Sequence, residues 1–156
     1  TQRQHQWRQA HGGPYVYTPQ IVLDGRDMRD WSSLRSGVLP KPKASSAATI
    51  KLEAQDGVVR ASVVNAPADK NLAGYWVVLE DGIESRVKAG ENSGSTLKHD
   101  HVVVHYQPVA AWAAGAPLQS TLTLPASLKP LGTRRVAFVL TQGDGLLALQ
   151  AAVLGC

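Results

Sequence analysis

GENSGSTLKHDHVVVHYQPVAAW, residues 90–112, decides the fold because it combines a turn with a long strand pattern. Its first glycines flank residue types that hydrogen-bond their own backbone, which favours a turn. Residues 97–106 are rich in β-branched and ring side chains and lack Gly and Pro, so they predict one strand. Alternation gives this strand a face that carries Leu97, His99, His101, Val103 and His105. We expect that face to be semi-exposed, and Val102, Val104 and Tyr106 to face the core.

The same period of two runs through most of the chain after residue 47. Alternating apolar side chains predict strands near residues 49–54, 59–64, 74–81, 119–124, 134–141 and 146–154. Turn residues separate these segments, and Asp56-Gly57 is a strong hairpin signal. With about eight short strands and no convincing helix, residues 47–156 predict an antiparallel β-sandwich, most typical of the immunoglobulin-like class. The fold class is therefore mainly β.

The first 37 residues have a different pattern. Residues 1–10 are polar around Trp7 and predict a short helix that needs a partner surface. After it we expect short strands at Tyr15–Tyr17 and Gln20–Leu23, a turn at Asp24-Gly25, and a short helix over Asp27–Ser36 with Trp31 and Leu34 inward. Two prolines, two lysines and two serines mark residues 38–46 as a linker between this segment and the β domain.

Two stretches of the chain resemble one protein family. The first is Gly90-Glu91-Asn92-x-Gly94-x-x-Leu97-x-His99-x-x-Val102-Val103, and the second is VYTPQIVLDG, residues 16–25. Both resemble the DUF1223 family, exported bacterial proteins of unknown function that are filed as thioredoxin-like. This resemblance implies that residues 1–37 are the second half of a thioredoxin-like α/β fold. It also implies a periplasmic or secreted location.

In such a fold, the resemblance makes Tyr17, Thr18 and Pro19 the wall of a thiol site, with Pro19 in a cis peptide bond. An X-Pro bond takes the cis form at a cost of only about 0.5–1 kcal/mol, so the sequence permits it. An ordinary trans-proline turn is the alternative reading.

The sulfur chemistry of that fold needs a thiolate nucleophile. The chain has one cysteine, Cys156, at its last position, and no Cys-x-x-Cys precedes Pro19. We therefore expect the chain to be redox-silent by itself and to be the carboxy-terminal portion of a longer protein. Its expected partners are the missing thioredoxin-like half and a protein thiol or disulfide.

His99 and His101 have a spacing that can bind a metal ion. Side chains two apart on one strand project the same way, about 7 Å apart, so two imidazoles can share Zn or Cu. The alternative is that they are surface histidines that form hydrogen bonds or sense pH. Similarly, Glu91 and Asn92 either cap their turn or contact a partner.

Charge and motifs exclude several other classes. Residues 1–43 hold seven Lys or Arg against three Asp or Glu, an excess of four, and residues 44–156 hold nine of each. The basic residues are not interleaved with stacking aromatics, so we expect no nucleic-acid partner. No apolar run approaches the roughly 20 residues of a membrane-spanning helix. A Gly-x-Ser-x-Gly hydrolase elbow and phosphate-binding glycine loops are also absent from the sequence.

These observations predict a non-catalytic β-sandwich that shields or positions a thiol site or binds a partner. Two alternatives stay open. The intact protein is a thiol-disulfide oxidoreductase in the first, and His99 and His101 form a metal-binding module in the second. Apart from Zn or Cu in that last case, no cofactor is expected.

Overall fold

The computed structural model describes residues 2–23, 26–29, 37, 48–67, 71–113, 115–126, 134–143 and 146–154. The chain divides into two compact units, residues 1–45 and residues 46–156. The predicted linker 38–46, the turn Asp24-Gly25, residues 30–36 with Trp31 and Leu34, and Cys156 lie outside the described residues.

The first unit contains the predicted helix, α1 (Gln2–Ala10), and a small antiparallel pair, β1 (Val22–Leu23) and β2 (Arg26–Asp27). Gly12 follows two residues after the end of α1 and has a positive φ, which is typical of a glycine that terminates a helix. Two of our predictions for this unit are wrong. Residues 15–17 are not a strand, because no described strand pairs with them, and Asp27 belongs to β2 instead of starting a helix.

The second unit consists of nine described strands. They are β3 (Thr49–Gln55), β4 (Val58–Val64), β5 (Leu72–Glu80), β6 (Ile83–Arg86), β7 (Thr96–His99), β8 (Val102–Trp112), β9 (Leu118–Thr123), β10 (Arg134–Gln142) and β11 (Ala148–Leu154). The hairpin at Asp56-Gly57 is confirmed between β3 and β4, and both of its turn residues have positive φ.

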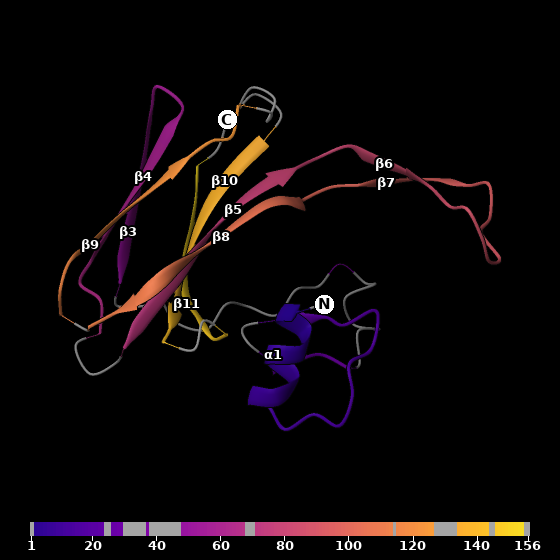
Figure 1. Cartoon of the computed structure of the whole chain (residues 1–156), viewed down its shortest axis with the longest axis horizontal. Coiled ribbons are helices and arrows are strands. Elements are labelled where there is room, and N and C mark those ends of the chain that lie inside the picture. The colour runs from indigo at the N-terminus through magenta and orange to yellow at the C-terminus, as the bar shows by residue number, and fades with distance from the viewer. Residues whose placement is uncertain are drawn as a thin grey trace. The chain divides into compact units, whose positions relative to one another are not determined.

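These strands form antiparallel sheets, so the prediction of a mainly β, antiparallel fold is confirmed. One sheet has the order β11-β10-β5-β8 and a second has the order β3-β4-β9. Figure 1 shows these two sheets as separate layers, and a two-stranded ribbon, β6-β7, that extends away from them.

The core lies between the two larger sheets because alternate residues of each sheet face the other. One buried cluster draws side chains from both sheets: Val59, Ala61 and Val63 of β4, Trp76 and Val78 of β5, Leu122 of β9, and Val136, Phe138 and Leu140 of β10. The indole N–H of Trp76 donates to Ser120 Oγ of β9 at 3.0 Å, which joins the layers. Trp76 also meets Phe138 edge to face, at 4.9 Å between ring centroids.

The predicted strand 97–106 is interrupted. β7 ends at His99 and β8 begins at Val102, and His101 between them has a φ of 59°. A second irregularity, a register shift opposite Val78 and Leu79, follows within β8. A bulge moves the later side chains to the opposite face. Val104 therefore packs against the core as expected, whereas Tyr106 is 46% exposed, contrary to our prediction.

Candidate functional site

The β6–β7 arm, residues 83–99, projects from the second unit and does not pack against either of its two larger sheets. Its strands pair antiparallel, with Ile83 opposite His99 and Ser85 opposite Leu97. None of its residues belongs to the buried cluster or packs against it. The arm is therefore a two-stranded ribbon that lies outside the packed core of this unit.

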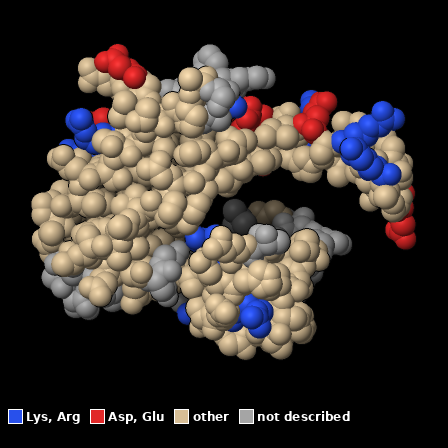
Figure 2. Space-filling view, in the orientation of Figure 1, with Lys and Arg blue, Asp and Glu red and all other residues tan. Residues whose placement is uncertain are grey.

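Residues paired across the two strands share a face of the arm. The residue types on the two faces differ. Ile83, Ser85, Leu97 and His99 make one face, which we call the apolar face; Glu84, Arg86, Thr96 and Lys98 make the other, the charged face. On the apolar face Leu97 is 43% exposed. On the charged face Lys98 Nζ lies 3.9 Å from Glu84 Oε1, an exposed pair of little energetic weight. Figure 2 shows blue side chains gathered on the outer part of the arm.

The tip of the arm is an ordered turn. Val87 exchanges two backbone hydrogen bonds across it, one to Ser95 O and one from Gly94 N, both 2.9 Å long. Gly90 and Gly94 both have positive φ, which side chains disfavour. The ladder of the arm therefore continues beyond its regular strands to Val87.

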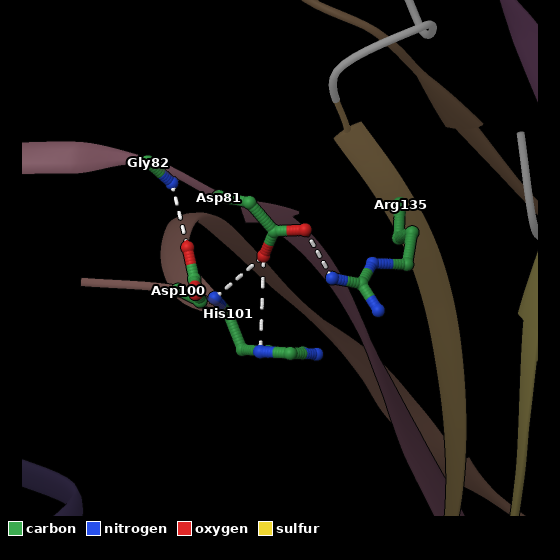
Figure 3. Close-up of polar contacts among 5 residues, drawn as sticks. All are labelled: Asp81, Gly82, Asp100, His101 and Arg135. Atoms are coloured by element: carbon green, nitrogen blue, oxygen red, sulfur yellow. Dashed lines mark hydrogen bonds and ion pairs between the residues drawn. The ribbon is translucent and has the colours of Figure 1, made fainter. Parts of the chain in front are cut away.

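A polar cluster anchors the root of the arm, where the chain leaves β5 and where it returns to β8 (Figure 3). Asp81 accepts a hydrogen bond from the backbone N–H of His101 at 2.8 Å, and its second oxygen accepts one from Arg135 of β10. Asp100 accepts from the backbone N–H of Gly82 at 2.9 Å. Each acid thus binds the opposite strand of the arm, so both connections are held in place.

The surroundings of Asp81 lower the pKa of its carboxyl. The hydrogen bond from the His101 N–H is the main cause; burial, the next largest, opposes it, and the hydrogen bond and charge of Arg135 lower the pKa further. The ring Nδ1 of His101 lies 3.7 Å from the same carboxylate. Asp81 therefore stays ionised over the whole neutral range and keeps the root together.

The two predicted metal ligands do not share a strand. His99 ends β7, and its Nε2 lies 2.7 Å from Ser85 Oγ on the apolar face. His101 lies in the bend at the root, beside Asp81. Among the described residues, no group of three or more His, Cys, Asp or Glu side chains is placed to hold a metal ion.

The first unit holds the predicted thiol-site wall. The Thr18–Pro19 peptide bond is cis, and both residues are exposed. The hydroxyl of Tyr17 donates to Asp27 Oδ1, and Arg29 Nε donates to Asp27 Oδ2 at 3.4 Å.

The family model of DUF1223, a protein of unknown function, matches residues 1–140. The chain belongs to the DUF1223 family. No curated protein matches the sequence.

Solved structures give the fold of this DUF1223 chain further support. Protein AGR_C_4864 from Agrobacterium tumefaciens is similar over 99% of this chain and 68% of its own, with a TM-score of 0.64 and 22% identity. HBP35 of Porphyromonas gingivalis matches 70% of this chain and 41% of its own, at 13% identity and a TM-score of 0.49. The first likeness concerns the fold alone, and the second is too distant to carry an argument.

The DUF1223 residues that the sequence singled out are divided between the arm and β8. Gly90, Glu91, Asn92 and Gly94 form the tip; Leu97 and His99 lie on the apolar face; Val102 and Val103 begin β8. Asn92 takes part in the tip through its backbone carbonyl, which accepts from Ser95 N at 3.1 Å. Most of this motif therefore lies on one projecting element.

Sequence reasoning missed the anchors of the arm, Asp81, Asp100 and Arg135. We placed Asp81 at the end of one predicted strand, residues 74–81, and Asp100 within another, residues 97–106. The sequence held part of this signal. Asp81-Gly82 lies at one end of the β6–β7 hairpin and Asp100-His101 at the other. Arg135 is 54 residues from Asp81, and no local pattern connects them.

In the described residues, no helix has the length and the apolar character needed to cross a membrane.

Proposed function

We propose that this DUF1223 chain is a non-catalytic protein-binding module, and that the apolar face of the β6–β7 arm is its contact surface. The observation that carries the proposal is an amphipathic ribbon with no second layer. Leu97 is 43% exposed on it, beside the half-buried Ile83 and His99. An isolated two-stranded ribbon is only marginally stable in water, so covering this face stabilises the arm.

The shape of the arm favours a protein over a small ligand. Small molecules bind in concave pockets that enclose most of their surface. A projecting ribbon encloses nothing, but it fits a groove on another protein and can add side-chain contacts along its length. Fully burying a leucine side chain contributes about 1.5–3 kcal/mol. Leu97 is 43% exposed, so covering the rest of it contributes about 1 kcal/mol.

The root cluster supports the same function. Asp81 and Asp100 each bind the opposite strand, and Arg135 links Asp81 to the large sheet. A ribbon held at both connections leaves the sheet in one direction, which reduces the ordering cost of binding. A loose hairpin would lose that advantage.

The family resemblance supplies the wider setting of the proposal. Residues 1–37 are then the second half of a thioredoxin-like fold, and residues 47–156 an immunoglobulin-like sandwich in an exported protein. The helix and the small hairpin of the first unit agree with that assignment. The partner is a protein that carries a thiol or disulfide site.

Adjacent positions on β7 provide a matched test. A photo-crosslinking amino acid replaces Leu97 on the apolar face in one variant and Lys98 on the charged face in another. After irradiation in the exporting bacterium, we expect one discrete adduct from position 97 and much less of it from position 98. Leu97→Asp, combined with a crosslinker at Ile83, should remove the adduct.

The proposal fails if positions 97 and 98 give equal adducts, or if neither gives one. Purified variants with unchanged far-ultraviolet circular dichroism exclude misfolding as the cause. Mass spectrometry then identifies the partner, and an adduct with a protein that lacks cysteine would contradict the thiol setting while leaving the binding surface intact.

A further inference from the structure

The first unit contains a hollow of about 260 Å³ that the arm does not use. One wall is α1, which contributes Trp7 and Arg8, followed by His11 just beyond its end. The other wall holds Tyr17, Asp27 and Arg29. All of these residues belong to the first unit, so the hollow is complete within it.

Among the described residues of this lining, the single acid is already occupied. Asp27 is only 16% exposed, and both of its oxygens accept hydrogen bonds, one from the Tyr17 hydroxyl and one from Arg29 Nε. The hydrogen bond to Asp27 is the main cause that raises the pKa of Tyr17. Asp27 therefore positions its neighbours and has little capacity left for a cationic ligand.

Hydrogen-bond donors, in contrast, are left over. The indole Nε1 of Trp7 is buried and has no partner within the described residues. The Arg8 side chain lines the hollow and forms no hydrogen bond or ion pair within the described residues, whereas its backbone carbonyl accepts from the Gly13 N–H at 3.0 Å. Arg29 is 68% exposed, and its bond to Asp27 is made by Nε, so its terminal amines are not bound to that carboxylate. With two guanidinium groups against one carboxylate, the described part of the lining has an excess of one positive charge.

The remaining surface of the hollow is aromatic. Trp7 and His11 stack with 4.0 Å between ring centroids and 12° between their planes. Arg29 lies over the ring of Tyr17, at 6.0 Å from its centroid. Flat, weakly polar walls favour a planar or apolar body, while the guanidinium forks favour a carboxylate, which they bind in a bidentate manner.

We propose that this hollow binds a small organic carboxylate with an aromatic or apolar body. Its volume is slightly below the usual range of about 300–1,000 Å³ for ligand pockets, which suits a group the size of one side chain. Two sources have this chemistry, a free aromatic acid and the carboxyl end of a peptide. Arg8 and Arg29 bind the carboxylate, and the stacked rings of Trp7 and His11 contact its aromatic or apolar body.

The test uses the full chain and the indole N–H signals of its four tryptophans in proton NMR. Trp7→Phe assigns the signal of Trp7. Phenylacetate is the probe for a free acid, N-acetylphenylalanine is the probe for a peptide end, and phenylacetamide is the neutral control. We expect the acids to shift the Trp7 signal, and phenylacetamide to bind at least about tenfold more weakly, since the hydrogen bonds to a charged group are lost.

Arg8→Gln and Arg29→Gln should each weaken acid binding about tenfold or more. Arg60→Gln, which removes an exposed arginine of β4, is the matched control and should leave binding unchanged. Arg8→Gln does not touch the Asp27 contacts, so it separates lost binding from a disturbed lining.

Equal binding of phenylacetamide, no effect of Arg8→Gln, or shifts confined to tryptophans other than Trp7 would each overturn the proposal. Preferential binding of phenylacetate or of N-acetylphenylalanine would support it and would identify the source. Leu97→Asp alters the arm and not the hollow, so this site is tested independently of the protein-binding surface.

Discussion

The carboxylate of Asp81 accepts a hydrogen bond from the backbone N–H of His101 at 2.8 Å. Asp81 follows β5 and His101 precedes β8, so this bond closes the root of the arm. Because the backbone of His101 has positive φ, its N–H turns toward the acid instead of continuing a strand ladder. With the bond from the Gly82 N–H to Asp100, this contact joins the two connections of the β6–β7 arm.

The root should loosen in acid. The folded-state pKa of Asp81 lies below its ordinary value of 3.8, chiefly because of the His101 N–H. A lowered pKa stabilises the fold above the ordinary value, and this contribution is lost as pH falls through the folded-state value. We expect the amide protection factor of His101, measured by hydrogen exchange, to decrease below about pH 4.

Asp81→Ala should show the reduced protection of His101 at every pH. Glu53→Gln, which removes an exposed acid from β3, is the control and should behave as the parent chain does. A His101 amide that is equally protected at pH 3 and pH 6 would contradict this role of Asp81.

Tyr17 should ionise at a higher pH than an ordinary tyrosine. Its hydrogen bond to Asp27 raises its pKa above 10.0, with smaller contributions from burial and from the charge of Asp27. A raised pKa stabilises the fold below pH 10 and ceases to do so as pH rises through the folded-state value. NMR titration of the tyrosine ring carbons measures this. In Asp27→Asn the Tyr17 pKa should fall, whereas Asp56→Asn should leave it unchanged.

Gly74→Ala should destabilise the second unit. A Cβ at this position would lie 2.7 Å from Phe138 Cζ and 3.0 Å from the carbonyl oxygen of Val139. Overpacking of this kind costs about 1–3 kcal/mol of unfolding free energy, measured by urea titration. Phe138→Leu removes the nearest ring atom, so adding Gly74→Ala to that variant should cost less. The same cost in both backgrounds would show that the ring is not the obstacle.

Metal binding at His99 and His101 stays a prediction, and we expect it to be weak. His99 is engaged with Ser85, and His101 lies beyond the end of β7, so the two imidazoles do not project from one strand. After loading with Zn or Cu and gel filtration of untagged protein, the metal content should be near zero per chain. One retained equivalent that His99→Ala removes, and that Ser85→Ala leaves in place, would establish the metal site.

The sequence alone determined the elements whose signals are local. Alternation correctly predicted the strands at β3, β4, β5, β9 and β10, and Asp56-Gly57 correctly predicted the first hairpin. The motif around Gly90 and His99 indicated the family, which the match over residues 1–140 then showed. Such signals depend on neighbours a few residues apart, and that is the range over which a pattern can be interpreted without coordinates.

Only the tertiary structure decided where those elements go. The positive φ of His101 and the bulge in β8 changed which side chains face outward, because one inserted residue reverses every later position of a strand. The anchor between Asp81 and Arg135, and the carboxylate that Tyr17 shares with Arg29, join side chains that no repeat or motif relates. Periodicity specifies how the side chains of a strand alternate. Which charges pair, and where the β6–β7 arm leaves the sheet, depend on which distant residues the fold brings within hydrogen-bond reach.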